Sequence, residues 1–257
     1  MHKKYLPIGV FDSGAGGITV LKTCAQVLPN ENFLYYGDTK NSPYGNLSDQ
    51  QITELTFCAV DKLISKGVKA VVIACNTATA AAINALRAKH NDLDIIGIEP
   101  AIKPACLKTD GKVLVLLTQA AARQDKFRSL IQRCGLEKII VCPLKDLAQK
   151  IEHNIDDFNK LRPYIFNILR DYQNSDIKAV VLGCTHYIFV RDLIAQVFPN
   201  AVLYDGNTGV ANRIKDLLSK KDLLNDANQK QIVELYSSDS KYQLIYQNLW
   251  QKYSNNF

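Results

Sequence analysis

The sequence has 257 residues, of which 47% are hydrophobic and 22% charged, the balance of a globular protein with a sizeable core. Its net charge of +6 arises from 31 basic and 25 acidic residues scattered along the chain, which indicates a solvated surface rather than a nucleic-acid groove. No apolar run approaches the length of a membrane span, and no apolar stretch of signal-peptide length precedes Asp12. We therefore expect a cytoplasmic protein with neither nucleic-acid nor membrane partners.

Apolar runs alternate with amphipathic stretches in the first hundred residues. Gly67 follows one amphipathic stretch directly, and glycine is the usual residue just past a helix C-terminus. The predicted elements are, in chain order, a strand over 5–11, a helix over 18–28, a strand over 32–36, a helix over 50–66, a strand over 70–74, a helix over 77–89 and a strand over 94–98.

The alternation then starts again. The predicted elements are a strand over 112–117, a helix over 120–134, a strand over 138–142, a helical stretch over 144–174 with a break before Pro163, a strand over 179–182, a helix over 190–198, a strand over 201–204, a helix over 211–224 and a short strand over 231–235. This alternation predicts the α/β class, with mostly parallel sheets and helices on both sheet faces.

Two segments of the chain match each other. VVIACNT (71–77) and VVLGCTH (180–186) are each an apolar strand, a small residue, a cysteine and then polar residues. The two cysteines, Cys75 and Cys184, are 109 positions apart, which is about the length of one domain. FDSG (11–14) and YDGN (204–207) form a weaker match. We predict two domains with internal pseudo-symmetry.

The chain has seven cysteines, an odd number, and no CxxC pair, so neither a disulfide framework nor a zinc ribbon is supported. We expect most of them to be small buried apolar residues. Cys75 and Cys184 differ because each lies at the carboxyl end of a predicted strand, where parallel sheets bind ligands, and before a predicted helix. A helix N-terminus favours negative charge, so it can lower the pKa of a thiol from its reference value of about 8.5.

Racemisation requires a proton to leave one face of a carbon and another to arrive on the opposite face. Two residues on opposite sides, one thiolate and one thiol, can do this in either direction while the substrate stays fixed. Cys75 and Cys184, in matched contexts, fit that demand. The alternative is a pair of buried structural cysteines.

Polar and glycine-rich segments follow the first two strands. DSGAGG (12–17) lets the backbone approach a ligand closely, but it is neither G-x-G-x-x-G nor a P-loop, so we do not expect a nucleotide. Asp12 could hold a substrate ammonium or tune a nearby thiol. The alternative is an ordinary helix N-cap by Asp12 or Ser13. GDT (37–39) and PYG (43–45) form a turn-rich candidate wall of the site.

His186 lies two residues after Cys184 and has three candidate roles. As the base of a thiol hydrolase it would leave Cys75 unexplained, and as a zinc ligand it lacks convincing partners. We favour a role in tuning Cys184, with a capping or packing histidine as the alternative. Asn76, Thr77 and Thr185 are helix caps or hydrogen-bond donors to a carboxylate.

Five segments together resemble the aspartate/glutamate racemase family, and most closely its glutamate-specific members. They are GVFDSGAGGITVL (9–21), YYGDTKNSPYG (35–45), ACNTATA (74–80), IEPAIKPA (98–105) and GCTHY (183–187). The resemblance implies two flavodoxin-like α/β domains related by pseudo-two-fold symmetry, with glutamate bound in the cleft between them. It also implies an isomerase that uses no pyridoxal phosphate, no other cofactor and no metal. Cys75 then deprotonates D-glutamate and Cys184 deprotonates L-glutamate, and Asp12 and His186 assist.

The resemblance further implies the substrate contacts, the assembly and the biological role. The substrate-binding residues carried over are Ser13, Pro43, Tyr44, Gly45, Asn76, Thr77, Thr118, Thr185 and His186. The expected product is D-glutamate for peptidoglycan synthesis, hence for the cell wall and cell shape, and the expected assembly is a homodimer. The expected domains are residues 1–98 with 208–257, and residues 99–207.

The chain departs from the family pattern mainly in its second half. Ile188 stands where the family has proline, and DGN (205–207) replaces a second Asp-Ser-Gly. Counting from Cys142-Pro143 to the family's catalytic-site glutamate reaches Lys150, and Glu152 lies two residues further, so we assign Glu152 as the assistant of Cys184. The alternatives are a racemase of aspartate or another amino acid, or a non-catalytic amino-acid-binding module.

Overall fold

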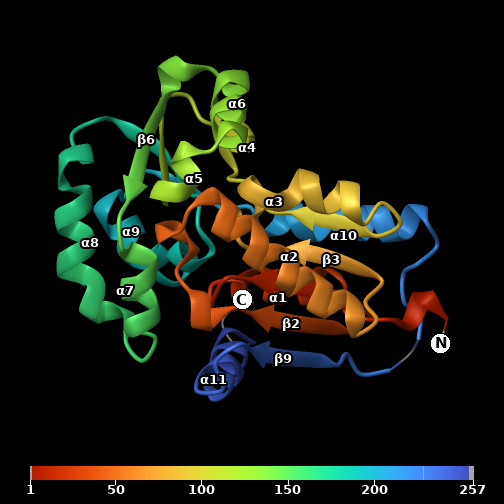
Figure 1. The fold of residues 1–257 in the computed structure, drawn as a ribbon. Coiled ribbons are helices and arrows are strands. Elements are labelled where there is room, and N and C mark those ends of the chain that lie inside the picture. The colour runs from red at the N-terminus through yellow and green to blue at the C-terminus, as the bar shows by residue number, and fades with distance from the viewer. Residues whose placement is uncertain (1, 228, 255–257) are drawn as a thin grey trace.

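Two parallel β-sheets lie side by side in the computed structural model, which describes residues 2–227 and 229–254 (Figure 1). The first sheet has the strand order β4-β3-β1-β2-β9, and each strand runs parallel to its neighbours. Its strands are β1 (Ile8–Asp12), β2 (Phe33–Gly37), β3 (Ala70–Ile73), β4 (Asp94–Gly97) and β9 (Val233–Ser237).

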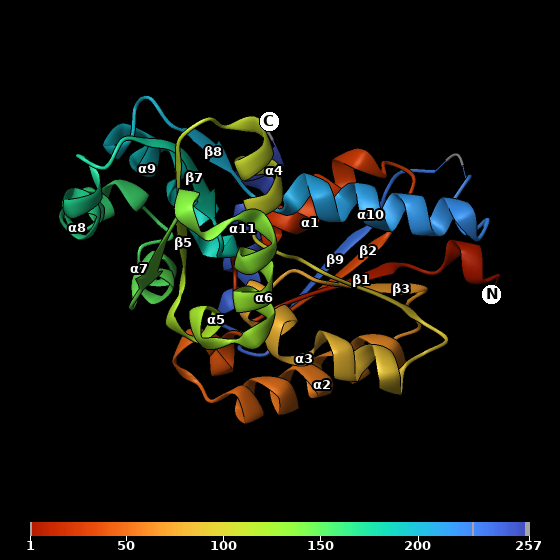
Figure 2. The same cartoon turned by 90° about the horizontal axis from the view of Figure 1, so that it is seen from above.

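Helices cover both faces of the first sheet (Figure 2). Val10 and Tyr35 point toward α1 (Ile18–Val27), α10 (Asn207–Lys220) and α11 (Tyr242–Ser254), whereas their neighbours Phe11 and Tyr36 point toward α2 (Asp49–Ser65) and α3 (Asn76–Lys89). Successive residues of a strand face opposite sides, so strands buried on both faces are apolar throughout. This explains why the central strands β1, β2 and β3, which are buried throughout, appear in the sequence as apolar runs.

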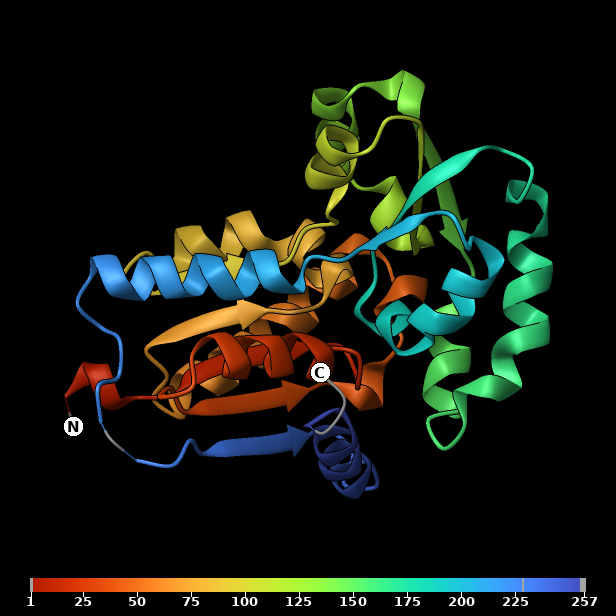
Figure 3. The same ribbon diagram turned by 180° about the vertical axis from the view of Figure 1, so that it is seen from behind.

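The second sheet has the order β6-β5-β7-β8 and is also parallel (Figure 3). Its strands are β5 (Lys112–Thr118), β6 (Ile139–Leu144), β7 (Ile177–Leu182) and β8 (Val202–Tyr204). One face packs against α4 (Ile102–Lys108) and α6 (Asp125–Cys134), and the other against α7 (Leu147–His153), α8 (Arg162–Leu169) and α9 (Arg191–Val197). The short α5 (Gln119–Arg123) follows β5.

The strand order confirms the predicted pseudo-symmetry and the flavodoxin-like α/β class. The order β2-β1-β3-β4 in one sheet matches β6-β5-β7-β8 in the other. Cys75 follows β3 and Cys184 follows β7, so the two cysteines occupy equivalent positions. The weaker match, FDSG with YDGN, is not structural, because residue 205 follows β8, the counterpart of β4. The counterpart of the β1 loop follows β5, at Thr118.

Several predicted helix boundaries in the second half were wrong. The helix predicted over 120–134 is divided into α5 and α6 by Gln124, whose backbone is extended (φ −78°, ψ 139°). In the stretch predicted as helical over 144–174, Leu144 still belongs to β6, and Pro163 lies in the first turn of α8, where proline is tolerated. Elements α4 and α11 were missed. Short 3-10 helices lie at Lys3–Tyr5, Thr39–Asn41, Tyr44–Asn46, Leu136–Lys138, Phe158–Leu161, Arg170–Tyr172 and Thr185–Val190.

The chain leaves the first sheet after β4 and returns to it after β8. The division into residues 1–98 with 208–257 and residues 99–207 stays a proposal about independent folding units. In the part of the chain that the structure describes, no helix combines the length and apolarity needed to span a bilayer.

A buried ion pair closes the amino-terminal end of the first sheet. Lys69 Nζ lies 2.5 Å from Glu31 Oε2, and both side chains are almost fully buried. The same ammonium donates to the carbonyl oxygens of Lys4 and Leu223 at 2.6 and 2.9 Å. Lys69 therefore joins four separate segments of the chain beneath the sheet.

Replacing Lys69 by methionine is expected to lower the free energy of unfolding by about 3–5 kcal/mol, because the Glu31 carboxylate would remain buried without its counter-charge. Urea denaturation measures the change. Lys220→Met, at an exposed position of α10, is the matched control and is expected to change the free energy by less than about 0.5 kcal/mol. Equal stability of the two variants would contradict the role of the pair.

Candidate active site

Asp12 is the last residue of β1 and lies in the buried junction between the two sheets. Asp12 Oδ1 accepts a hydrogen bond from Gly14 N at 2.9 Å, and Oδ2 accepts one from Thr185 Oγ1 of the second sheet's side at 3.1 Å. Burial raises the pKa of Asp12, and the nearby His186 opposes that rise. A Cβ at Gly17 would lie 2.4 Å from Asp12 Cβ, so the tight loop requires glycine there.

Cys75 lies two residues after the end of β3 and caps the N-terminus of α3. Its Sγ accepts from Ala78 N at 3.4 Å and lies 3.4 Å from Ser13 Oγ. Burial, followed by the charge of Asp12, raises the pKa of Cys75 to about 12, although both hydrogen bonds act in the opposite direction. Cys75 is therefore a neutral thiol at physiological pH. The hydrogen bond from Ala78 N in the first turn of α3 lowers this pKa, as expected from the sequence, but burial outweighs it.

Cys184 follows β7 and lies next to the ionisable side chain of His186, which in turn contacts Glu152. His186 Nδ1 lies 3.8 Å from Cys184 Sγ, and His186 Nε2 lies 2.7 Å from Glu152 Oε1 of α7. Burial by itself lowers the pKa of His186, but contacts with Cys184 and Glu152 outweigh it, so the net pKa lies well above its ordinary value. The segment directly after Cys184 is the 3-10 helix Thr185–Val190, and the helix predicted over 190–198 begins at Arg191, so the ionisable group beside this sulfur is His186 rather than an α-helix N-terminus.

Glu152 also contacts the loop after β1. Its Oε1 accepts from Ala15 N at 2.8 Å as well as contacting His186. A Cβ at Gly14 would lie 1.9 Å from the same oxygen, so a side chain at this position would displace the carboxylate of Glu152. Sequence reasoning missed Ala15 because a backbone N–H leaves no mark on residue type. The only available signal was the glycine beside it.

Several of the predicted substrate-binding residues contact one another. Thr77 Oγ1 and Thr118 Oγ1 lie 2.9 Å apart across the two halves, and Thr118 Oγ1 also caps α5 by accepting from Ala121 N at 3.2 Å. A Cβ at Gly45 would lie 3.2 Å from Thr118 Cβ. Pro43, Gly45 and Thr118 line a cavity of only about 10 Å³, so the two halves meet closely here.

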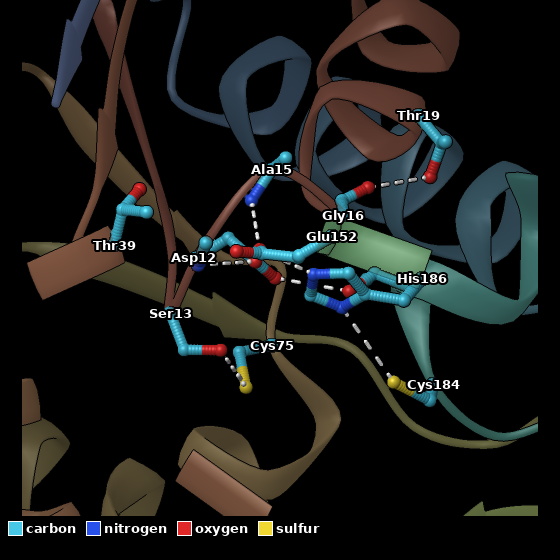
Figure 4. Close-up of polar contacts among 12 residues, drawn as sticks. Asp12, Ser13, Ala15, Gly16, Thr19, Thr39, Cys75, Glu152, Cys184 and His186 are labelled. Atoms are coloured by element: carbon cyan, nitrogen blue, oxygen red, sulfur yellow. Dashed lines mark hydrogen bonds and ion pairs between the residues drawn. The ribbon is translucent and has the colours of Figure 1, made fainter. Parts of the chain in front are cut away.

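The remaining predicted contacts lie in the same region. Tyr44 is buried, and its hydroxyl donates to Asp38 Oδ2 at 2.8 Å. Asn76 opens α3, and its buried Oδ1 has no hydrogen-bond partner among the described residues. Figure 4 shows Cys75 on the side of Asp12 and Ser13, and Cys184 on the side of His186. The two thiols thus approach the junction from different sheets.

Within residues 2–227 and 229–254, no group of three or more His, Cys, Asp or Glu side chains is arranged to hold a metal ion. The zinc-ligand role considered for His186 therefore has no set of partner ligands in the described part of the chain. The contacts of His186 Nδ1 and Nε2 with Cys184 and Glu152 instead match a residue that tunes a thiol.

The sequence profile of Asp/Glu/Hydantoin racemases matches residues 34–213. The chain belongs to this family. It is 43% identical over 240 residues to the glutamate racemase of Clostridium acetobutylicum, and the match covers 93% of this chain and 94% of that protein.

Two solved structures of this racemase family are similar over almost their whole length. Glutamate racemase of Escherichia coli, in complex with L-glutamate and the activator UDP-MurNAc-ala, has a TM-score of 0.84 at 27% identity and covers 95% of each chain. Glutamate racemase of Francisella tularensis, in complex with D-glutamate, has a TM-score of 0.83 at 26% identity, covering 96% of this chain and 94% of that one.

Proposed function

We propose that this protein is a cofactor-independent glutamate racemase in which Cys75 and Cys184 are the two acid–base residues. The observation that carries the proposal is the placement of two buried thiols at equivalent strand ends of the two sheets. Two such groups can act on opposite faces of one α-carbon. A purely structural role would not require a cysteine at the equivalent position of both sheets.

The two thiols have different surroundings. The raised pKa of Cys75 keeps this thiol protonated, whereas Cys184 Sγ lies 3.8 Å from Nδ1 of His186, whose pKa lies well above its ordinary value. In the L-to-D direction, the Cys184 thiolate takes the α-proton and the Cys75 thiol delivers its proton to the opposite face. Cys184 then holds the proton and Cys75 is the thiolate, and the D-to-L direction reverses these steps.

The surrounding polar groups suit an amino acid. The first turn of α3, at Asn76 and Thr77, presents backbone N–H groups and the positive end of the helix dipole, which favour a carboxylate. Asp12 and the unpartnered Asn76 Oδ1 are acceptors for an ammonium. Glutamate as the substrate is supported by the names of the relatives and by the glutamate enantiomers bound in the two similar structures.

Proton NMR of the purified protein with D-glutamate in D₂O, without added cofactor, tests the function. We expect the α-proton signal to disappear and L-glutamate to form in a chiral assay. Cys75→Ser protein, which lacks the base assigned to D-glutamate, is the control and should leave the signal unchanged. Exchange on aspartate but not on glutamate would change the assigned substrate. Exchange on no amino acid, with ligand-induced thermal stabilisation, would favour a non-catalytic binding module instead.

The homodimer, the cytoplasmic location and the supply of D-glutamate to peptidoglycan synthesis form part of the same proposal. Light scattering coupled to size-exclusion chromatography measures the assembly directly. A mass twice that of the chain is the expected result, and a monomeric mass at micromolar concentration would contradict it. Rescue of growth in a bacterium that requires D-glutamate tests the biological role.

A further inference from the structure

Tyr35 is a fully buried residue of β2, and its phenol contacts the loop after β1. Its hydroxyl donates a hydrogen bond of 2.6 Å to the carbonyl oxygen of Gly14. Burial, and then the charge of Asp12, raise the pKa of Tyr35 well above its ordinary value, so the hydroxyl stays protonated and acts as a donor. Tyr35 is outside the residues assigned to substrate or proton transfer.

The Gly14 carbonyl belongs to the same peptide unit as the Ala15 N–H. A peptide unit is planar, and in the trans form its C=O and N–H point in opposite directions, so holding one end fixes the direction of the other. The Ala15 N–H donates to Glu152 Oε1 at 2.8 Å, and that oxygen lies 2.7 Å from His186 Nε2. A continuous polar chain therefore runs from Tyr35 to Cys184.

The C-terminal helix supports Tyr35 in this position. The ring of Tyr246 in α11 packs edge-on against Tyr35, with centroids 5.5 Å apart and an interplanar angle of 81°. The Tyr246 hydroxyl is hydrogen-bonded to Thr39 Oγ1. A Cβ at Gly37 would lie 2.7 Å from the Gly14 oxygen and 2.1 Å from the Tyr246 hydroxyl, so the close packing depends on glycine at that position.

We propose that Tyr35 is a positioning residue for the Cys184 half of the site, acting through the Gly14–Ala15 peptide to hold Glu152 against His186. The assignment rests on the proposed racemase function. Glu152 reaches the peptide from the second sheet's helix α7, whereas Tyr35 and the peptide belong to the first sheet's side. Without the Tyr35 hydroxyl, the peptide can rotate and the carboxylate loses one of the two contacts that fix its rotamer.

Tyr35→Phe is expected to lower kcat by roughly 10- to 100-fold, the size of effect that a small misplacement of catalytic groups produces. The KM should change by less than about twofold, because Tyr35 does not contact the substrate. Tyr36→Phe is the matched control, since it removes a hydroxyl from the next residue of the same strand on the opposite sheet face, where the partner is Lys62. Equal kcat values for both variants would overturn the proposal.

Two further measurements separate positioning from a general structural effect. In the Glu152→Gln background, Tyr35→Phe should add less than about a twofold loss, because both changes act on one contact. Independent and multiplicative losses would argue against the route through Glu152. NMR titration of the His186 ring, which faces Asp12, Glu152 and Cys184, should show its pKa moving down toward the ordinary value in Tyr35→Phe but not in Tyr36→Phe.

Ala15→Gly is a second variant that loosens the same peptide without removing the phenol, for use if Tyr35→Phe does not fold. This variant should also have a lower kcat, with a smaller change in KM. An unchanged kcat in the folded variant would overturn the proposal. A wild-type protein that racemises no amino acid would refute the proposed function itself. The His186 titration would then still report whether Tyr35 holds Glu152 in place.

Discussion

Replacing either Cys75 or Cys184 by serine is expected to lower kcat/KM for glutamate racemisation by about 10³-fold, within the range that general acid–base groups contribute. A hydroxyl is a far weaker acid than a thiol. Serine therefore neither ionises to act as the base nor readily donates its proton as the acid. Each variant should lose both directions equally. The two enantiomers have the same free energy, so the equilibrium constant is one and kcat/KM must match in the two directions.

Circular dichroism detection of the enantiomers, started separately from pure D- and pure L-glutamate, measures both rates. Cys142→Ser is the matched control, because Cys142 is another buried cysteine of the second sheet and lies outside the site. It should retain wild-type turnover once its folded fraction is accounted for. Substantial turnover in Cys75→Ser or Cys184→Ser would refute the two-base mechanism.

Replacing Glu152 by glutamine should change both the rate and its pH dependence. The contact with Glu152 is one of the causes that hold the pKa of His186 above its ordinary value, so removing the carboxylate lowers that pKa. The imidazolium beside Cys184 then loses its proton at a lower pH. The alkaline limb of the kcat/KM profile should therefore move to lower pH, by roughly 1–3 units for a charge partner at this distance.

A pH–rate profile of kcat/KM between pH 6 and about 10 tests this shift, since that parameter reports groups of the free enzyme. Glu234→Gln, an exposed carboxylate on β9, is the control and should leave the profile unchanged. An alkaline limb at the wild-type position in Glu152→Gln would show that Glu152 does not set the charge of His186.

The sequence predicted the strands, the parallel α/β class and the equivalent positions of Cys75 and Cys184, because each follows from a local sequence pattern. Buried parallel strands are short apolar runs, and a cysteine at the end of such a run lies at the ligand-binding edge whatever the tertiary detail. The helices of the second half were harder to predict. Residues 144–174 contain several short helices whose boundaries depend on packing, and α11 lies after the last element that could be predicted.

Counting residues from the Cys142-Pro143 motif did not predict the position of the glutamate that contacts His186. Lys150 occupies the counted position, yet its ammonium lies over the ring of Tyr164, at 4.8 Å from the centroid. Successive helix residues are about 100° apart, so two positions turn a side chain to the opposite side of α7. Only the packed helix determines that Glu152 faces His186. The same limit applies to Tyr35, whose role depends on a carbonyl oxygen rather than on a side chain.

The burial of the two thiols makes their chemical labelling a measure of how often the protein opens. Cys75 and Cys184 are only 6% and 8% exposed, whereas Cys58 lies on the surface of α2. An alkylating reagent should modify Cys58 at once and the two site thiols only during excursions that break the Thr77–Thr118 and Asp12–Thr185 contacts. Bound glutamate should make those excursions rarer. The labelling rates of Cys75 and Cys184, followed by mass spectrometry separately from those of the buried Cys24 and Cys142, therefore measure how often the site opens to solvent.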